Sequence, residues 1–282
     1  MREAGRGVDR DTLPAVDDPC VTTTVEAPDG ARLEARRHGG HVVGWTPAGG
    51  RERLWLSPLA RCGPGEAIRG GLPVIFPQFA GRGPLPKHGV ARDREWQLAP
   101  SAPGAWKAVL NDDTATRAIW PHAFELTLTA TAVGDRLDTE LAVRNTGDAS
   151  FTFTAALHGY LALGGPDATV HGLGGHRAED NEQGNRVVTV PDGPLVAVDQ
   201  RDIAVRDVSG PVTLDDPVLG PLTLTADGFA DRVLWNPGPD AGLGDVPPGG
   251  ASGFVCIEAA QLTPVTLAPG ETWTGLQTLR SA

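Results

Sequence analysis

The chain has 282 residues, 40% of them hydrophobic, with a formal net charge of −11 and a sequence pI near 5.0. A strongly negative protein is not attracted in general to DNA, RNA or anionic membranes, so we expect neither nucleic acid nor a membrane as partner. Glycine and proline together supply 62 residues (37 plus 25), a level that is typical of many short strands joined by turns.

The N-terminal segment and the three cysteines set further limits on the class of protein. Residues 1–17 are rich in charge and poor in apolar side chains, which predicts a loose arm before a single domain over residues 18–282. The start lacks a signal-peptide core, and no run of about twenty apolar residues occurs, so we expect a cytoplasmic protein. Cys20, Cys62 and Cys256 are odd in number and lack metal-ligand spacing, so we expect neither a disulfide framework nor a zinc site.

Strands are predicted along nearly the whole chain. The first four are expected at residues 31–39, 41–47, 52–57 and 95–100. An alternating apolar and polar pattern then predicts an antiparallel meander at residues 124–133, 137–145 and 150–161. Further strands are expected at residues 187–190, 211–216, 222–227, 231–237, 253–262 and 272–280. No long amphipathic helix with caps is indicated, and we predict an all-β fold, a large antiparallel β-sandwich.

An arginine at the edge of an apolar run is the first candidate for function. Arg69 lies in "AIRGGLPVIFPQF", between an apolar pair and the two glycines Gly70 and Gly71. Three interpretations are open: a surface arginine at a turn, a partner of a buried acid such as Glu66, or a ligand for an anion.

A second cationic stretch follows at once. "LPKHGVAR", residues 85–92, brings Lys87, His88 and Arg92 within six positions, and Lys87 is one of only two lysines in the chain. The stretch is either a solvated basic loop or part of an anion site.

Two polar residues interrupt apolar strands. His158 lies in "TAALHGYLAL", where a histidine is either a hydrogen-bonded core residue or a catalyst. Glu258 lies in "GFVCIEAAQL", where a carboxylate is costly unless it is paired or used; a structural salt bridge and a general base are the two interpretations. The stretch "VDQRDIAVRD" contains three further carboxylates, and each of them, taken alone, is predicted to be an exposed loop residue: Asp199, Asp202 and Asp207.

Five stretches taken together carry a family resemblance. "AIRGGLPVIFPQF", "LPKHGVAR", "LHGYL", "VLWNP" and "FVCIE" follow one another in an order and spacing that resembles the aldose 1-epimerase superfamily, over roughly residues 25–280. Within it, the AIRGG and HGxAR blocks look most like the glucose-6-phosphate 1-epimerase branch. The resemblance implies a galactose-mutarotase-like β-supersandwich, in agreement with the strand pattern.

The resemblance also implies roles for individual residues. The general acid falls on His158 and the general base on Glu258, acting as an imidazolium and a carboxylate. A family aspartate falls on Asp202, with Asp199 as its rival because the usual Asp-Arg context is broken here. The implied substrate-binding residues are Arg69, Lys87, His88, Arg92, Asp202 and Trp235.

The implied activity is exchange between the α and β anomers of a hexose-6-phosphate by acid–base ring opening and closure. Such a reaction needs no metal and no cofactor, and we expect a monomer that binds a small phosphosugar. Two alternatives stay open: a free-aldose 1-epimerase, or a non-catalytic carbohydrate-binding relative.

Overall fold

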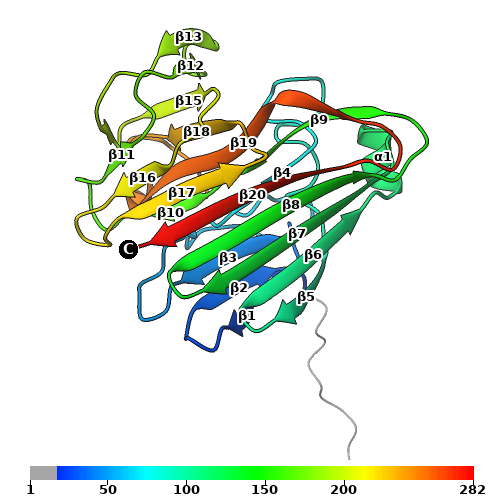
Figure 1. Cartoon of the computed structure of the whole chain (residues 1–282), viewed down its shortest axis with the longest axis horizontal. Coiled ribbons are helices and arrows are strands. Elements are labelled where there is room, and N and C mark those ends of the chain that lie inside the picture. Colours follow the sequence, from blue (N-terminus) through cyan, green and yellow to red (C-terminus); the bar gives the residue numbers. More distant parts are fainter. Residues whose placement is uncertain (1–17) are drawn as a thin grey trace, which may run out of the picture.

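A computed structural model describes residues 18–282, so the arm predicted for residues 1–17 lies outside the described residues. The described chain folds into three antiparallel sheets of three, eight and nine strands, with one short α-helix and one short 3₁₀-helix (Figure 1). The predicted all-β antiparallel sandwich is therefore confirmed. No helix within residues 18–282 is long and apolar enough to cross a bilayer.

The order of strands in each sheet places the site described below. The small sheet has the order β1 (Thr23–Glu26), β2 (Arg32–Arg36), β3 (His41–Thr46). The eight-stranded sheet has the order β13 (Arg186–Thr189), β12 (Arg177–Asp180), β15 (Arg201–Val205), β18 (Asp231–Asn236), β19 (Phe254–Leu267), β9 (Phe151–Leu157), β4 (Val74–Ile75), and β10 (Tyr160–Ala162) also pairs with β19.

The nine-stranded sheet contains the predicted meander at its centre. Its order is β14 (Leu195–Val196), β11 (Thr169–His171), β16 (Val212–Asp215), β17 (Leu222–Asp227), β20 (Thr272–Ser281), β8 (Arg136–Asn145), β7 (Phe124–Val133), β6 (Ala105–Asn111), β5 (Gln97–Ala102). The helices are α1 (Thr114–Ile119), which begins in a capping box at Asp113, and η1 (Gly250–Gly253).

The main core lies between the two large sheets. Alternation along β7 buries Phe124, Leu126 and Leu128 on one face, as the pattern predicts. Aromatic rings join the layers: Phe153 of the eight-stranded sheet meets Trp273 of the nine-stranded sheet with ring centroids 5.6 Å apart. The facing sides of the two large sheets are therefore joined by this core.

The opposite face of the eight-stranded sheet carries small apolar side chains. Ala156, Ala204, Val233 and Ala260 come from four neighbouring strands and pack with Ile75 in a separate buried cluster. Small residues on a sheet face leave room above it, and the candidate site is built there.

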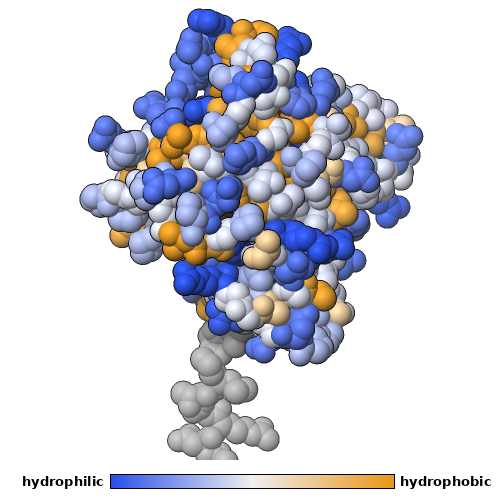
Figure 2. All heavy atoms as spheres, turned by 60° about the vertical axis from the view of Figure 1, so that its left-hand side comes forward, coloured by the Kyte–Doolittle hydropathy of each residue, from blue (hydrophilic) through white to orange (hydrophobic). Residues whose placement is uncertain are grey.

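Exposed large hydrophobic side chains come from separate points of the chain. Figure 2 shows one face on which hydrophilic residues surround hydrophobic ones in several places. Scattered apolar side chains of this kind are ordinary on a folded surface. The exposed ones among the described residues are Val21, Leu59, Val133, Val187, Val196 and Val218.

One strand prediction is wrong, and seven strands were not predicted: β1, β4, β6, β11, β12, β14 and β15. Residues 52–57 form only two isolated bridges, Leu54 with Leu161 and Leu56 with Gly70, because the extended segment changes partner after each bridge. Residues 201–205, which read as loop, form β15, because their edges pair with β12 and β18 in the middle of the sheet. Tertiary pairing overrides the local pattern in both places.

The cysteine prediction also needs correction. Cys20 and Cys62 form a disulfide, and Cys256 is free and buried. An odd count argued against pairing, but the fold brings two distant segments together around His38. The backbone N–H of His38 donates to the Pro19 carbonyl at 3.0 Å, and its ring Nε2 donates to the Glu66 carbonyl at 2.6 Å.

We expect the disulfide to stabilise the protein by closing a loop of 42 residues in the unfolded chain. Replacing both Cys20 and Cys62 by serine should lower the free energy of unfolding by about 2–4 kcal/mol, measured by urea denaturation. Dithiothreitol should lower the wild-type midpoint and leave that of the double variant unchanged. Equal wild-type midpoints with and without reductant would contradict the prediction.

Candidate active site

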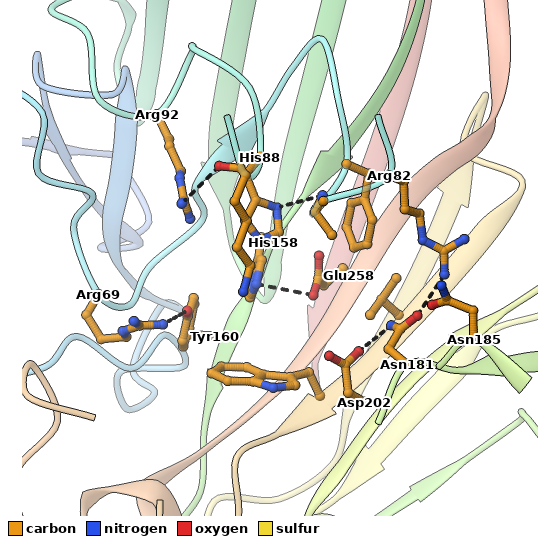
Figure 3. Close-up of a pocket in the computed structure, with 16 residues that line it drawn as sticks. Arg69, Arg82, His88, Arg92, His158, Tyr160, Asn181, Asn185, Asp202 and Glu258 are labelled. Atoms are coloured by element: carbon orange, nitrogen blue, oxygen red, sulfur yellow. Dashed lines mark hydrogen bonds and ion pairs between the residues drawn. The ribbon is translucent and has the colours of Figure 1, made fainter. Parts of the chain in front are cut away.

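A cleft of about 420 Å³ opens on the outward face of the eight-stranded sheet, a size within the usual range of small-molecule sites (Figure 3). The loop that follows β4 forms one wall, and the strand face forms the floor. All of the residues predicted from the sequence to bind or act on a substrate line this cleft. They are Arg69, Lys87, His88, Arg92, His158, Asp202, Trp235 and Glu258.

Strand register explains why these residues meet. Glu258 of β19 lies directly opposite Val233 of β18, and Asp202 of β15 lies opposite Trp235 of β18. Directly opposed residues of an antiparallel pair point to the same face. Three neighbouring strands thus deliver two carboxyl groups and an indole to one surface.

His158 and Glu258 contact each other in the floor of the cleft. Nε2 of His158 lies 3.3 Å from Oε1 of Glu258, and Glu258 is only 1% exposed (Figure 3). Nδ1 of His158 and Oε2 of Glu258 are buried without a hydrogen-bond partner in the protein. Buried polar atoms are rarely left unpartnered, so these two are available to a ligand.

Burial sets the protonation of this pair. Burial first, and then the nearby Arg92 charge, lowers the pKa of His158 to about 3. Burial, together with the Asp202 charge, raises the pKa of Glu258 well above its usual range. Burial thus drives each group toward its neutral form in the unliganded cleft, and the predicted imidazolium and carboxylate roles stay a prediction.

Of the three interpretations left open for Arg69, the structure shows a pairing with an acid, but not with the one expected. Its Nε donates to Oδ2 of Asp245 at 3.0 Å and its Nη1 to the hydroxyl of Tyr160 at 2.9 Å. The acid is therefore Asp245, not Glu66, which instead lies 3.9 Å from Arg61. Part of the Arg69 guanidinium is engaged by the protein while the residue still lines the cleft.

The two glycines after Arg69 lie where other backbone segments approach too closely for a Cβ. Gly71 has φ of +63°, and a Cβ there would lie 2.3 Å from the Val42 carbonyl oxygen. The carbonyl of Gly70 accepts a hydrogen bond from Nε2 of the fully buried His41 at 2.8 Å. His41 thus fixes the backbone that carries Arg69.

Arg92 and Lys87 differ from Arg69 in their pairing. Nη2 of Arg92 donates to the Lys87 carbonyl at 3.4 Å, and within residues 18–282 Arg92 forms no ion pair. Burial lowers the pKa of Arg92, but a guanidinium stays charged near neutrality. The side chain of Lys87 is exposed at the rim. These two cations are available to an anionic ligand.

His88 approaches the pair from the loop. Its ring centroid lies 5.6 Å from that of His158, and its Nδ1 accepts a hydrogen bond from the Ala80 amide at 3.3 Å. His88 has φ of +69°, an unusual conformation for a residue other than glycine and one that often marks a functional site. Burial lowers the pKa of His88 strongly, so its imidazole is neutral.

The rival aspartates are separated by the fold. Asp202 lines the cleft, and burial raises the pKa of its carboxyl group. Asp199 lies outside the lining residues and faces Arg201 at 3.6 Å with a largely exposed side chain. Asp207 is also remote from the lining and donates its backbone amide to Asp231.

Several cleft residues were missed by sequence reasoning. Tyr160 stacks on His158 with centroids 4.9 Å apart, and its being the only tyrosine of the chain was a usable signal. Arg82, Asn181 and Asn185 also line the cleft, but they come from loop segments that carry no pattern of their own. Asp245 lies in a loop whose composition does not reveal its contact with Arg69.

Within residues 18–282, no group of three or more His, Cys, Asp or Glu side chains is arranged to hold a metal ion. The groups present can accept and donate protons, bind an anion and pack against a ring. Trp235 adds an apolar face beside the Arg69 guanidinium, whose carbon lies 6.0 Å from the indole centroid.

The architecture is that of the mutarotase-like β-sandwich proteins. A crystal structure from Salmonella typhimurium, named "a putative mutarotase (YeaD)", matches with a TM-score of 0.82 and 29% identity over 92% of this chain and 89% of that one. A galactose mutarotase related enzyme from Lactobacillus acidophilus matches at a TM-score of 0.75 over 93% of this chain and 97% of that one; at 15% identity it supports the fold alone.

The chain belongs to the aldose 1-epimerase family, whose model matches residues 22–280. Curated relatives from Cenchrus ciliaris and Salmonella typhimurium are both 32% identical, over 84% and 80% of this chain and 78% of their own lengths. Both carry the name "Putative glucose-6-phosphate 1-epimerase". The family resemblance drawn from the five sequence stretches is confirmed.

His41 should make the stability of the protein depend on pH. Burial lowers its pKa to about 3 from an ordinary 6.5, so between these values the unfolded chain binds more protons than the folded one. The free energy of unfolding should therefore fall as the pH falls through this window, by about 2 kcal/mol at pH 5 from this residue.

His41→Gln keeps a donor for the Gly70 carbonyl and removes the titration. Urea denaturation at pH 7 and pH 5 should show a smaller loss of stability for the variant than for the wild type. Equal losses would show that His41 is not held neutral in the fold.

Proposed function

We propose that this protein interconverts the α and β anomers of a hexose-6-phosphate. The observation that carries the proposal is a buried His158–Glu258 contact of 3.3 Å in the same cleft as Arg92, a cation that forms no ion pair within residues 18–282. The names of the curated relatives agree with this substrate class.

Anomer exchange requires a proton to leave the C1 hydroxyl, a proton to reach the ring oxygen, and rotation about the C1–C2 bond before closure. In its neutral form the pair holds one transferable proton, on Glu258, and one free base, on His158. The carboxylic acid can protonate the ring oxygen while the imidazole takes the hydroxyl proton, and ring closure returns both. The pair with an imidazolium and a carboxylate holds the same number of protons as the pair with a neutral imidazole and a carboxylic acid. The bound sugar therefore decides whether His158 or Glu258 donates first.

Phosphate binding would change this balance. Arg92 and Arg69 lower the pKa of His158 through their charge, after burial itself. A phosphate dianion held by these cations offsets their field and makes an imidazolium less costly. The 6-phosphate therefore contributes both affinity and a more basic His158. The reaction needs no redox cofactor and no covalent intermediate.

One observation favours free aldoses as the substrate instead. Asp245 already occupies the Nε side of Arg69 at 3.0 Å, which leaves less of the guanidinium for a phosphate. The two candidate functions differ in whether activity depends on the remaining cations. Anomer exchange followed by NMR, with glucose-6-phosphate and with glucose, distinguishes them.

Removing either member of the pair should abolish most of the activity. His158→Asn and Glu258→Gln keep similar shapes but lose the proton-transfer group, so we expect kcat to fall by about a hundredfold or more. NMR exchange spectroscopy of glucose-6-phosphate measures the rate, and circular dichroism checks the fold. A folded variant with a near-wild-type rate would remove that residue from the mechanism.

The cations should matter for the phosphorylated sugar above all. A charge-assisted hydrogen bond contributes about 1.5–3 kcal/mol, so Arg92→Ala should lower kcat/KM for glucose-6-phosphate about ten- to a hundredfold and for glucose much less. Lys87→Ala should act in the same direction. Lys107→Ala, which changes the other lysine of the chain, an exposed residue of β6, is the matched control. Equal losses on both sugars would favour the free-aldose alternative.

A further inference from the structure

We propose that Arg82 is a positioning residue of this cleft, which orients the carboxylate of Asp202 through the side chain of Asn181. None of the sequence motifs includes Arg82 or Asn181. The inference rests on the proposed function in one respect: Asp202 is taken to hold a sugar hydroxyl.

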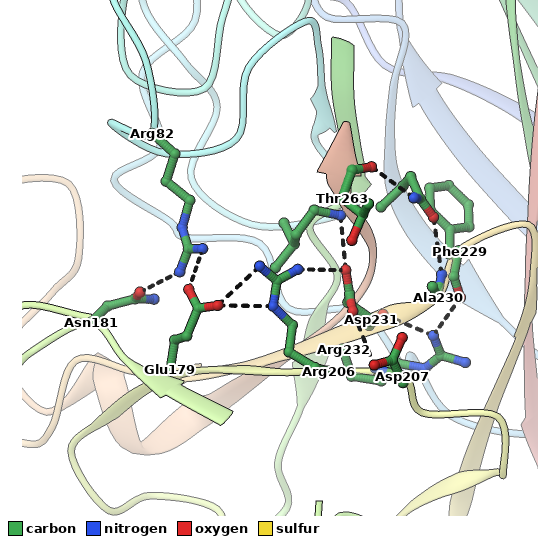
Figure 4. A network of polar contacts seen from close by, with 12 residues as sticks. Arg82, Glu179, Asn181, Arg206, Asp207, Phe229, Ala230, Asp231, Arg232 and Thr263 are labelled. Atoms are coloured by element: carbon green, nitrogen blue, oxygen red, sulfur yellow. Dashed lines mark hydrogen bonds and ion pairs between the residues drawn. The ribbon is translucent and has the colours of Figure 1, made fainter. Parts of the chain in front are cut away.

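Arg82 reaches its partners across the sheet. It lies on the loop that follows β4, at one edge of the eight-stranded sheet, while its partners Glu179 and Asn181 lie on β12 and just after it. Four strands separate β4 from β12 in the sheet order: β9, β19, β18 and β15. The loop therefore extends over the floor of the cleft, and the Arg82 guanidinium joins its tip to the far side (Figure 4).

The contacts run in one direction from Arg82 to the cleft. Nη2 of Arg82 donates to Oδ1 of Asn181 at 2.8 Å, and Nδ2 of Asn181 donates to Oδ1 of Asp202 at 2.5 Å (Figure 3). A guanidinium can only donate, so it holds the Asn181 oxygen toward itself and turns the amide nitrogen toward Asp202. Oδ2 of Asp202 receives no hydrogen bond from the described protein and is available to a ligand hydroxyl.

The other half of the Arg82 fork is anchored. Its Nη1 lies 2.6 Å from Oε2 of Glu179, whose Oε1 is held by Arg206 at 3.0 Å. Arg206 in turn contacts Asp231, which is 1% exposed, at 3.0 Å. The four side chains alternate in charge, so each cation has a partner and the row as a whole is neutral (Figure 4).

This row also predicts that changing Arg82 leaves the fold intact. Without Arg82, Glu179 keeps its ion pair with Arg206. The loop is held independently by Gln78, whose amide donates to the carbonyls of Ala80 and Leu85 at 3.1 and 3.0 Å. Lys87 and His88 therefore stay in place, and the effect of Arg82 reaches the cleft through Asn181.

A double-mutant cycle tests the coupling. Arg82→Gln should lower kcat/KM for glucose-6-phosphate about tenfold, with most of the change in KM, because Asp202 would contact the substrate before and during the reaction. Asp202→Asn should cost at least as much. In the Asp202→Asn background, Arg82→Gln should have little further effect, because its target is already lost.

Two more variants separate positioning from structure. Arg82→Lys should recover only part of the activity, since one ammonium cannot bridge Glu179 and Asn181 as the planar fork does. Arg201→Gln is the matched control: Arg201 adjoins Asp202 in the chain but pairs with Asp199 outside the lining of the cleft, and it should leave KM unchanged.

Calorimetry measures the Kd of glucose-6-phosphate for the wild type, the two single variants and the double variant, which gives the same double-mutant cycle for binding. Additive losses from Arg82→Gln and Asp202→Asn, or a wild-type KM and Kd in Arg82→Gln, would overturn the inference. A wild type that binds the sugar phosphate without exchanging its anomers would end the proposed function alone, because the cycle would still be readable in Kd. A wild type that does not bind it would overturn both.

Discussion

The two-faced construction of the eight-stranded sheet is the constraint on which the rest of the structure depends. One face must be apolar to pack against the nine-stranded sheet, and strict alternation then sends every second residue of β15, β18 and β19 outward. Small residues on that outward face, with Asp202, Trp235 and Glu258 among them, make a floor that is closed to the core and open to a ligand. A slip of one residue in β15 or β19 would bury its carboxylate between the sheets.

Placing charge on such a floor has an electrostatic consequence. Glu258 and His158 are buried, and burial lowers the pKa of His158 and raises the pKa of Glu258, so each is driven toward its neutral form. The cations around them have distinct surroundings. Arg69 is tied to Asp245 and Arg82 to Glu179, whereas Arg92 has no carboxylate partner in the described structure. A protein with net charge −11 thus has a local cationic corner, Lys87 and Arg92, at this cleft.

Some features were readable from the chain because they depend on neighbours in sequence. The alternation at residues 124–133 predicts β7, and a carboxylate within an apolar strand marks Glu258. Others depend on which distant segments meet. The Cys20–Cys62 disulfide, the pairing of residues 201–205 as β15, and the contact of Asp245 with Arg69 all join segments whose local composition is unremarkable or misleading.

The sequence by itself determined the all-β class, the family and eight of the residues that line the cleft, because strand period and motif spacing are local properties of the chain. Tertiary structure alone decided which of Asp199 and Asp202 faces the cleft, which acid pairs with Arg69, and that Arg82 lies beside Asn181. These are matters of strand register and of loops crossing a sheet. A side chain's partner and its protonation follow from burial and distance, and both exist only once the strands have paired.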